Sequence, residues 1–402
     1  MVDKRLRTAL GIYPRETLPS ERCGKLMPLP REGVSWIEVL RELRTILRSQ
    51  PTHFTGFVGS MTTVPHPLAK QVFLEFSELN ANDIATFRAI RVLEEEAVSM
   101  MGEILGCSSC TGMITSGGSE ANIAALYLAR EHGYETVYAS PVAHDSVFKA
   151  ARILRMRVVR VPHTSFRIDV QMLEKALREN GPGVIVATVG TTGFGTIDPV
   201  EEVCKLARSY GCVVHVDAAF GGFVAPFIYR GRRLCFENSA VVSATMDPHK
   251  LGLAPIPCGG LIVRDERWFE PLVFEARYMP EGRQIGLLGT RSAGSIAAAW
   301  AMLKHMGWRG YEAQARILMD RALRLVNLCR SIGIEPVVEP EVPVVCLAIE
   351  RDNEALEFAR RKGLYLYKCG LARGVRVVIG PHVDEGTIEL IARVLKLFTS
   401  RS

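Results

Sequence analysis

Between residues 111 and 263 the sequence alternates short apolar runs with segments of helical character, and this alternation limits the possible folds more than any other feature. The runs are continuous and rich in Val, Ile and Ala, as in strands that are buried on both faces. They lie at 112–115, 136–139, 157–161, 183–189, 212–217, 240–245 and 260–263. Helices between such strands predict an α/β fold, with a mostly parallel seven-stranded sheet and helices on both of its faces.

The segments before and after this region have a different pattern. Apolar residues recur at helical spacing over 36–47, and residues 84–105 also predict a long helix. After residue 291 the sequence predicts a linking helix over about 292–306 and then a small α+β domain. The strands of that domain are expected at 342–350, 364–367 and 375–380, and its last helix at 388–398. We therefore expect an N-terminal helical segment (1–58), a large domain (59–290) and a small C-terminal domain (291–402).

Length and composition argue against several classes of protein. The 402 residues, 48% hydrophobic and 23% charged, are ordinary for a globular chain. The net charge of +6 is spread along the sequence rather than gathered into a basic face for nucleic acid. The N-terminus lacks the apolar core of a signal peptide, and the longest apolar stretch, 211–228, is interrupted by His215, Asp217 and several glycines. We expect a cytoplasmic protein that binds neither nucleic acid nor membrane.

The ten cysteines are scattered and do not resemble the dense framework of a small secreted protein. Cys107 and Cys110 form one CxxC pair. A tetrahedral zinc site needs four ligands, and neither a second CxxC nor a nearby pair of histidines supplies the other two. We expect no metal, and the sequence leaves open whether these two cysteines pair with each other.

In open α/β sheets the ligand site lies beyond the carboxyl ends of the strands, so the residues that follow each run are the candidates for function. Ser116, Gly117, Gly118 and Ser119 follow the first run and precede a predicted helix. A glycine turn at a helix N-terminus favours a phosphate, because free N–H groups and the helix dipole both attract an anion. The stretch matches neither a Walker loop nor the dinucleotide GxGxxG, and on its own it is more often an ordinary turn.

Three more side chains follow buried strands. Asp217 ends its strand, where a carboxylate needs a partner, either an arginine or a protonated heterocyclic nitrogen. His144 comes soon after another strand, as a hydrogen-bonded loop residue or as a ring that stacks on a flat ligand. Lys250 stands in the apolar loop "TMDPHKLGLAPIPCGG", where an amine either reaches to solvent or forms a Schiff base.

Together these features match the four parts of pyridoxal phosphate. The glycine turn suits its phosphate, Asp217 suits its ring nitrogen, His144 suits the face of its ring, and Lys250 suits its aldehyde. The matching stretches are "TSGGSEANIAAL", "AHDSVFKA", "GTTGFGTIDPV", "HVDAAFGGFVAPF", "TMDPHKLGLAPIPCGG" and "LGTRSAG". With them the chain resembles the fold-type I enzymes that use pyridoxal phosphate, and within these the group II amino-acid decarboxylases. It is most similar to the archaeal L-aspartate/L-tyrosine decarboxylases, from about Ser60 to the C-terminus.

The resemblance implies a role for each of these residues. Lys250 would carry the cofactor as a Schiff base, which removes the free ammonium from its apolar loop. Asp217 would keep the pyridine nitrogen protonated, so that the ring withdraws electrons. His144 would stack on one face of the ring and Ala219 would pack against the other.

Other residues are implied as contacts of the cofactor. Residues 116–119 would hold the phosphate, and His249, next to the lysine, would also contact it. The alternative for His249 is a structural hydrogen bond. Thr191 and Thr192 end another strand, and they either touch the cofactor or the reacting group or serve a tight turn.

Contacts with the substrate also follow from the resemblance. Arg376 matches a small-domain arginine that binds the α-carboxylate, which a guanidinium can hold in a bidentate manner; the alternative is a surface arginine on a strand. His66 lies in a segment that resembles the substrate-side loop of the family. Tyr278 lies where related decarboxylases place a tyrosine proton donor, on a mobile loop from the neighbouring subunit. Residues 81–90 depart from the family's pattern and leave substrate contacts there undefined.

The resemblance implies a homodimeric decarboxylase, with its active site near the subunit interface, that converts an L-amino acid to an amine and carbon dioxide. The first expected substrate is L-aspartate, giving β-alanine for coenzyme A biosynthesis, then L-tyrosine, giving tyramine for methanofuran biosynthesis, and L-glutamate also fits. An alternative is another enzyme with the same cofactor, such as a C–C lyase, a desulfurase or an aminotransferase. A third reading is a catalytically silent binding protein, which the intact Lys250, Asp217 and His144 argue against.

Overall fold

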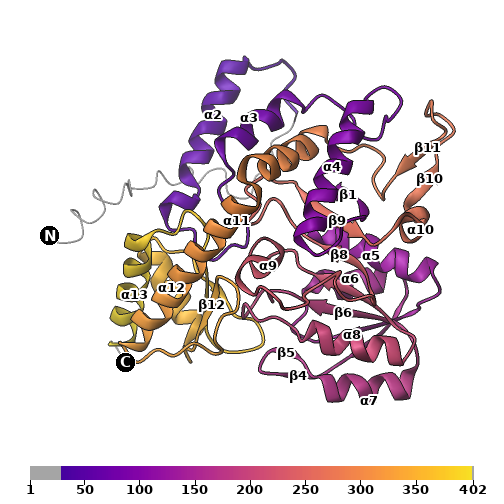
Figure 1. Cartoon of the computed structure of the whole chain (residues 1–402). Coiled ribbons are helices and arrows are strands. Elements are labelled where there is room, and N and C mark those ends of the chain that lie inside the picture. The colour runs from indigo at the N-terminus through magenta and orange to yellow at the C-terminus, as the bar shows by residue number, and fades with distance from the viewer. Residues whose placement is uncertain (1–28, 401–402) are drawn as a thin grey trace.

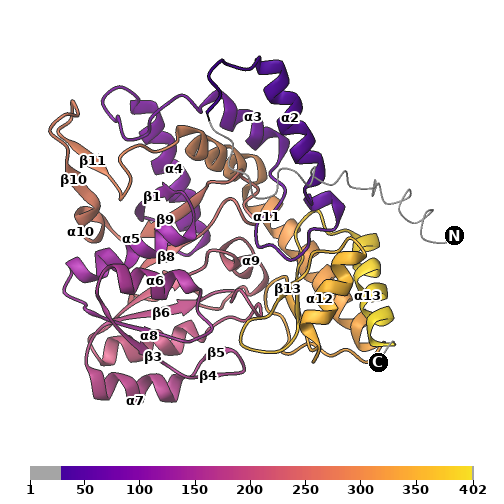
Figure 2. The ribbon, with the colours of Figure 1, turned by 180° about the vertical axis from the view of Figure 1, so that it is seen from behind.

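A computed structural model describes residues 29–400 of the chain (Figure 1). A central sheet with flanking helices forms one half of the molecule, and the C-terminal sheet and helices form a smaller unit beside it (Figures 1 and 2). The N-terminal residues considered for a signal peptide lie outside the described range, as does the first part of the expected segment 1–58.

The central sheet has seven strands in the order β1-β9-β8-β7-β6-β2-β3. Their bounds are β1 Thr111–Thr115, β2 Thr136–Ala139, β3 Arg157–Arg160, β6 Val184–Thr188, β7 Val213–Asp217, β8 Val241–Thr245 and β9 Gly259–Val263. The neighbours from β3 to β8 are parallel, whereas β9 runs antiparallel to both β8 and β1. The predicted mostly parallel sheet is confirmed, and each strand ends within one residue of a predicted run.

Successive strand residues explain why helices cover both faces of this sheet, since side chains alternate between the faces. Val184 and Val186 pack in one core cluster with α5 (Gly118–Glu131) and α6 (Asp145–Ile153). Ile185 and Ala187 pack in another cluster, together with apolar residues of the two helices on the opposite face. These helices are α7 (Val170–Asn180) and α8 (Val200–Ser209). Both faces of β6 are therefore buried, as its continuous apolar run predicted, whereas β3 at the edge of the sheet is partly exposed.

The N-terminal elements lie beside the start of a long helix (Figure 1). They are α2 (Trp36–Ser49), η2 (His53–Thr55), α3 (Pro67–Glu75) and α4 (Arg88–Ile104). The long helix, α11 (Ala293–Arg330), packs against α3, α4 and the last helix of the chain. Gly307 interrupts α11 with a left-handed φ of 54°, so the predicted linking helix over 292–306 matches its first part alone.

The small C-terminal unit is an antiparallel sheet in the order β12-β14-β13, with two helices. Its elements are β12 (Val344–Leu347), α12 (Asp352–Arg361), β13 (Tyr367–Lys368), β14 (Val375–Val378) and α13 (Glu385–Thr399). This is the predicted α+β arrangement, although the division at residues 58 and 290 stays a prediction.

Short elements complete the fold. The hairpins are β4–β5 (His163–Thr164, Arg167–Ile168) and β10–β11 (Val273–Glu275, Arg283–Ile285), and the short helices are η3 (Gly221–Phe223), α9 (Ala225–Ile228), α10 (Glu266–Phe269) and η4 (Glu270–Leu272). The β10–β11 hairpin projects away from the central sheet (Figures 1 and 2). Its tip is therefore not held by the core of the same chain.

The described residues contain two disulfide bonds, but neither a metal-binding group nor a membrane-spanning helix. Cys107 is bonded to Cys110, and Cys346 on β12 is bonded to Cys369. Over residues 29–400, no group of His, Cys, Asp or Glu is arranged to hold a metal ion. No helix in the same range has the length and apolar character needed to cross a membrane, and the cytoplasmic location stays a prediction.

Candidate active site

A cavity of about 320 Å³ opens beside the carboxyl ends of the parallel strands. Its wall contains most of the residues that the sequence singled out, namely 116–119, His144, Thr192, Asp217, Ala219, His249 and Lys250. These residues come from five separate stretches of the chain. The topology of the sheet brings them together because parallel strands end at one edge.

The glycine turn approaches the lysine loop closely. The N–H of Gly118 donates to Asp247 Oδ2 at 3.1 Å. A Cβ atom on Gly118 would lie 2.7 Å from the same oxygen, and one on Gly117 would lie 3.0 Å from His249 Cε1. Both positions are therefore restricted to glycine by space, and the turn presents its backbone to the cavity.

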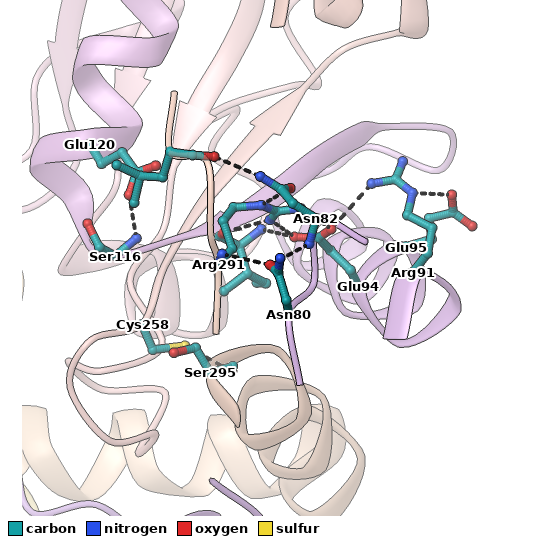
Figure 3. A network of polar contacts seen from close by, with 12 residues as sticks. Asn80, Asn82, Arg91, Glu94, Glu95, Ser116, Glu120, Cys258, Arg291 and Ser295 are labelled. Atoms are coloured by element: carbon teal, nitrogen blue, oxygen red, sulfur yellow. Dashed lines mark hydrogen bonds and ion pairs between the residues drawn. The ribbon is translucent and has the colours of Figure 1, made fainter. Parts of the chain in front are cut away.

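A buried ion pair supports the strand that leads into this turn (Figure 3). Arg291 Nη1 lies 2.5 Å from Glu94 Oε1, and both side chains are almost fully buried. Burial alone would raise the pKa of Glu94, but the charge and hydrogen bonds of Arg291 lower it below its usual value. Glu94 Oε1 also accepts from the N–H of Ile114, and Arg291 donates to the carbonyl of Ile114. The pair thus binds the backbone of β1 just before the glycine turn.

Lys250 lies in the cavity wall rather than at the surface. Its Nζ is 3.2 Å from Asp247 Oδ2, and its side chain is 16% exposed. The neighbouring His249 accepts from the N–H of Cys258 through Nδ1, which is the structural bond that the sequence left as an alternative. Burial is the main reason that the pKa of His249 is lowered.

Asp217 ends β7 and is held by neutral donors. Its Oδ1 accepts from the N–H of Ala219 at 3.2 Å, and its Oδ2 accepts from Asn122 Nδ2 at 3.0 Å. In the range that the structure describes, no arginine or lysine forms an ion pair with Asp217. The sequence left open an arginine or a protonated heterocyclic nitrogen as the partner of Asp217. Among the described residues, no arginine has this role.

His144 forms the N-cap of α6 and also lines the cavity. Its Nδ1 accepts from the N–H of Ser146 and lies 2.8 Å from Ser146 Oγ. Burial lowers the pKa of His144, and the nearby Asp217 offsets this only in part. The ring is thus fixed on one edge and faces the cavity as a neutral imidazole.

Arg376 lies outside the cavity lining but next to it. On β14 it is 8% exposed and donates to the carbonyls of Thr192 and Gly59, both at 2.9 Å. Its Nε is buried and has no protein partner, and burial lowers its pKa. Because Thr192 lines the cavity, the guanidinium lies at its rim, and Arg376 is not the surface arginine that the sequence kept as an alternative.

Three other predicted residues are not in the wall of this cavity. His66 caps α3, and its ring lies 5.0 Å from that of His305. Thr191 is buried with its hydroxyl 2.7 Å from that of Thr196, in keeping with the tight-turn alternative. Tyr278 is 78% exposed on the β10–β11 hairpin. The structure of one chain does not bring these three residues to Lys250.

The cavity wall also contains residues that the sequence did not single out. They are Glu120, Asn122, Thr188, Gly190, Phe220 and Asp247. Asn122 and Asp247 lie inside the quoted motifs "TSGGSEANIAAL" and "TMDPHKLGLAPIPCGG", which was the available signal for them. Thr188 Oγ1 and Asp247 Oδ1 are buried and lack a hydrogen-bond partner in the protein, so the wall retains unused polar atoms.

Comparisons with known proteins identify the family and the fold. The profile of the pyridoxal-dependent decarboxylase conserved domain matches residues 29–350. The probable L-tyrosine/L-aspartate decarboxylase of Methanothermobacter thermautotrophicus is 38% identical over 356 residues, which cover 86% of this chain and 98% of that protein. The L-aspartate decarboxylase of Thermococcus kodakarensis is 35% identical over 385 residues, covering 92% and 99% of the two chains. Among solved structures, sphingosine-1-phosphate lyase of Burkholderia pseudomallei shares the fold, with a TM-score of 0.86 at 22% identity over 95% of this chain and 94% of that chain.

Proposed function

The chain belongs to the pyridoxal-dependent decarboxylase family, and from this membership we propose that Lys250 is the attachment point of the cofactor in the cavity described above. The observation that carries the proposal is that Lys250, Asp217, His144 and residues 116–119 line one cavity. The enzyme is an amino-acid decarboxylase that uses pyridoxal phosphate. The roles of the individual residues are proposed from the resemblance to the family, and their positions in the cavity support them.

The cavity has the properties that such a cofactor requires. Its volume of about 320 Å³ lies in the range of small-molecule sites. Thr188 Oγ1 and Asp247 Oδ1 are buried without a partner, and a polar group left in this state costs about 1–3 kcal/mol. A bound polar ligand would remove that cost. When bound, pyridoxal phosphate supplies a ring that withdraws the electron pair left on the α-carbon as carbon dioxide departs.

Each side chain would contribute one interaction. Asp217, oriented by Asn122 and by the N–H of Ala219, is proposed to accept a hydrogen bond from the protonated ring nitrogen. Residues 116–119 at the start of α5 are proposed to bind the phosphate, although the N–H groups of Ser116 and Gly118 already donate to Glu120 and Asp247 in this structure. Asp247 holds the Lys250 amine on the cavity side, and His144 offers a flat face to the ring.

Covalent labelling tests the attachment point. The purified protein is incubated with pyridoxal phosphate, reduced with borohydride and digested, and the labelled peptide is sequenced by mass spectrometry. We expect a phosphopyridoxyl group on Lys250, because its amine is in the wall of the cavity. A label confined to another lysine would overturn the proposal, and so would a protein that takes up no cofactor.

We propose L-aspartate as the substrate, with β-alanine for coenzyme A biosynthesis as the product. The name of the Thermococcus relative supports this choice, and the Methanothermobacter relative is named for both L-aspartate and L-tyrosine. L-Tyrosine, giving tyramine, is therefore the second candidate. In either case Arg376 at the cavity rim is proposed to bind the α-carboxylate. Carbon dioxide release from each amino acid, with identification of the amine, tests both; a keto-acid product would instead indicate an aminotransferase.

We further propose that two copies of the chain form a homodimer. Helix α2 has no buried residue, and its exposed apolar side chains include Trp36, Leu43 and Leu47. The side chain of Tyr278, on the projecting β10–β11 hairpin, is also exposed. A second copy that covered α2 would remove this apolar surface from water. In such a dimer we propose that Tyr278 is the proton donor in the cavity of the partner subunit.

A further inference from the structure

In the cavity wall, one buried amide contacts Asp217 directly and His144 through Ser146. Asn122 lies on α5 and is 1% exposed. Its Nδ2 donates to Asp217 Oδ2 at 3.0 Å and to Ser146 Oγ at 2.8 Å. Ser146 Oγ lies 2.8 Å from His144 Nδ1. A single side chain therefore connects the carboxylate and the imidazole of the proposed cofactor site.

The direction of these bonds fixes where His144 carries its proton. Because an amide nitrogen only donates, Ser146 Oγ accepts from Asn122 and is left with its own proton to donate. That proton points to His144 Nδ1, and the N–H of Ser146 donates to the same nitrogen at 3.2 Å. His144 Nδ1 is thus an acceptor. A neutral ring in this setting carries its proton on Nε2, the nitrogen away from Ser146.

The oxygen of the amide is held as firmly as its nitrogen. Asn122 Oδ1 accepts from Thr245 Oγ1 at 2.7 Å and from His215 Nε2 at 3.0 Å. His215 is fully buried, and burial lowers its pKa to about 4, so it is neutral at physiological pH. Since an amide oxygen only accepts, His215 must carry its proton on Nε2, and its Nδ1 accepts from Ser243. These donors orient the Asn122 nitrogen towards Asp217 and Ser146.

We propose that Asn122 is a positioning residue that sets both the orientation of the Asp217 carboxylate and the tautomer of His144. His144 then presents an Nε2–H donor to the cavity, available to an acceptor on the cofactor or the substrate. The inference rests on the proposed function, which gives Asp217 and His144 their roles. It adds a role for Asn122, which acts on the cofactor site through the side chains of Asp217 and His144.

The tautomer can be observed without cofactor. Apoprotein labelled with 15N at histidine is examined by long-range 1H–15N correlation spectroscopy, and the signals are assigned with His144→Gln and His215→Gln variants. We expect the Nε2–H form for His144 in the native sequence. In Asn122→Asp, a carboxylate replaces the donating nitrogen and accepts the Ser146 proton, so Ser146 Oγ becomes an acceptor. The backbone N–H of Ser146 still donates to Nδ1, so the preference for the Nε2–H form should weaken and a population of the Nδ1–H form should appear.

A matched control has the same change of charge at an exposed position. Asn327→Asp on α11 should leave the His144 signals unchanged. If Asn122→Asp does not fold, as judged by its thermal melt, Ser146→Ala is the second variant. It removes the hydroxyl that connects Asn122 to His144 and leaves Asp217 in place, so a population of the Nδ1–H form should appear. A native Nδ1–H form, or an unchanged tautomer in the folded variants, overturns the inference.

The holoenzyme gives a second, independent readout. Asn122→Asp places an added negative charge beside Asp217, which favours protonated forms of the bound cofactor. The midpoint of the pH-dependent change in cofactor absorbance should therefore rise by about one pH unit or more. A labelled Lys250 together with an unchanged midpoint would reject the role of Asn122 alone. The absence of any label on Lys250 would reject the proposed function instead.

Discussion

At the scale of single residues, Lys250 is the amine that we propose to attach the cofactor. Its amine lies in the cavity wall beside Asp247, at 3.2 Å from Oδ2. Lys250→Ala should lower the rate of carbon dioxide release by about a hundredfold or more, while the backbone of residues 116–119 still retains part of the cofactor. Lys175→Ala, which changes an exposed lysine on α7, should leave both properties intact. Substantial decarboxylation by Lys250→Ala would contradict the assignment.

Arg376 gives a prediction of a different kind, because it lies at the rim and not beside Lys250. Arg376→Ala should raise KM for the amino acid by about tenfold or more, yet keep the absorbance of the Lys250-bound cofactor. It should also cost about 1–3 kcal/mol of folding stability, since the carbonyls of Thr192 and Gly59 lose their donor. Kinetics, absorbance and thermal unfolding measure the three effects. Loss of the cofactor absorbance would argue against a role confined to the substrate.

The residues that the sequence could predict are those next to strand ends, where motif and topology agree. Asp217 and Lys250 were found in this way. Thr188 was not, because a threonine in a buried strand carries no local sign of facing a cavity, and Asn122 lay inside a quoted motif but was not assigned a role. The unused oxygen of Asp247 is likewise visible only when its surroundings are known.

At the scale of elements, the Glu94–Arg291 pair fastens α4 and the segment before α11 to β1. Glu94→Gln should cost about 3–5 kcal/mol, because it leaves a buried arginine without its counter-ion. Glu95→Gln is the control. The Glu95 carboxylate is next in the sequence to Glu94, but it is 56% exposed and pairs with Arg91 at the surface. Urea unfolding at neutral pH measures the difference. Equal stability of the two variants would show that the pair does not hold these elements together.

The same pair predicts a dependence on pH. Arg291 lowers the pKa of Glu94 in the folded chain. The stability that the pair contributes is therefore fully present above the pKa of an unfolded glutamate, about 4.3, and is lost as the pH falls through the lower folded value. Unfolding curves from pH 7 downward should show this loss in the native sequence. Glu94→Gln should lack it, and a parallel pH profile in the two proteins would contradict the prediction.

Elements were predicted best where burial left a continuous apolar run, as in the seven central strands. The extent of α11 was underestimated, because its apolar first part ends at Gly307 and its amphipathic second part follows without a loop. The Glu94–Arg291 pair could not be predicted, since its partners are 197 residues apart and either one alone reads as a surface charge.

At the scale of the whole molecule, the exposed apolar side of α2 predicts assembly. The double change Leu43→Glu and Leu47→Glu should convert the proposed dimer to a monomer, because it places charges on that side of the helix. Arg41→Glu alters the charge on the opposite side and should not change the mass. Light scattering after size-exclusion chromatography measures both. A monomeric native protein, or a dimer that survives the double change, would contradict the assembly.

Arg376 joins backbone positions 59 and 192, so three distant parts of the sequence meet at one guanidinium. During translation, residues 116–250 leave the ribosome long before position 376 is made. The pocket for the cofactor can therefore form on a nascent chain that does not yet contain Arg376, the residue that we propose to bind the amino acid. The arginine that we propose for the amino-acid carboxylate is thus the last of the proposed site residues to be made.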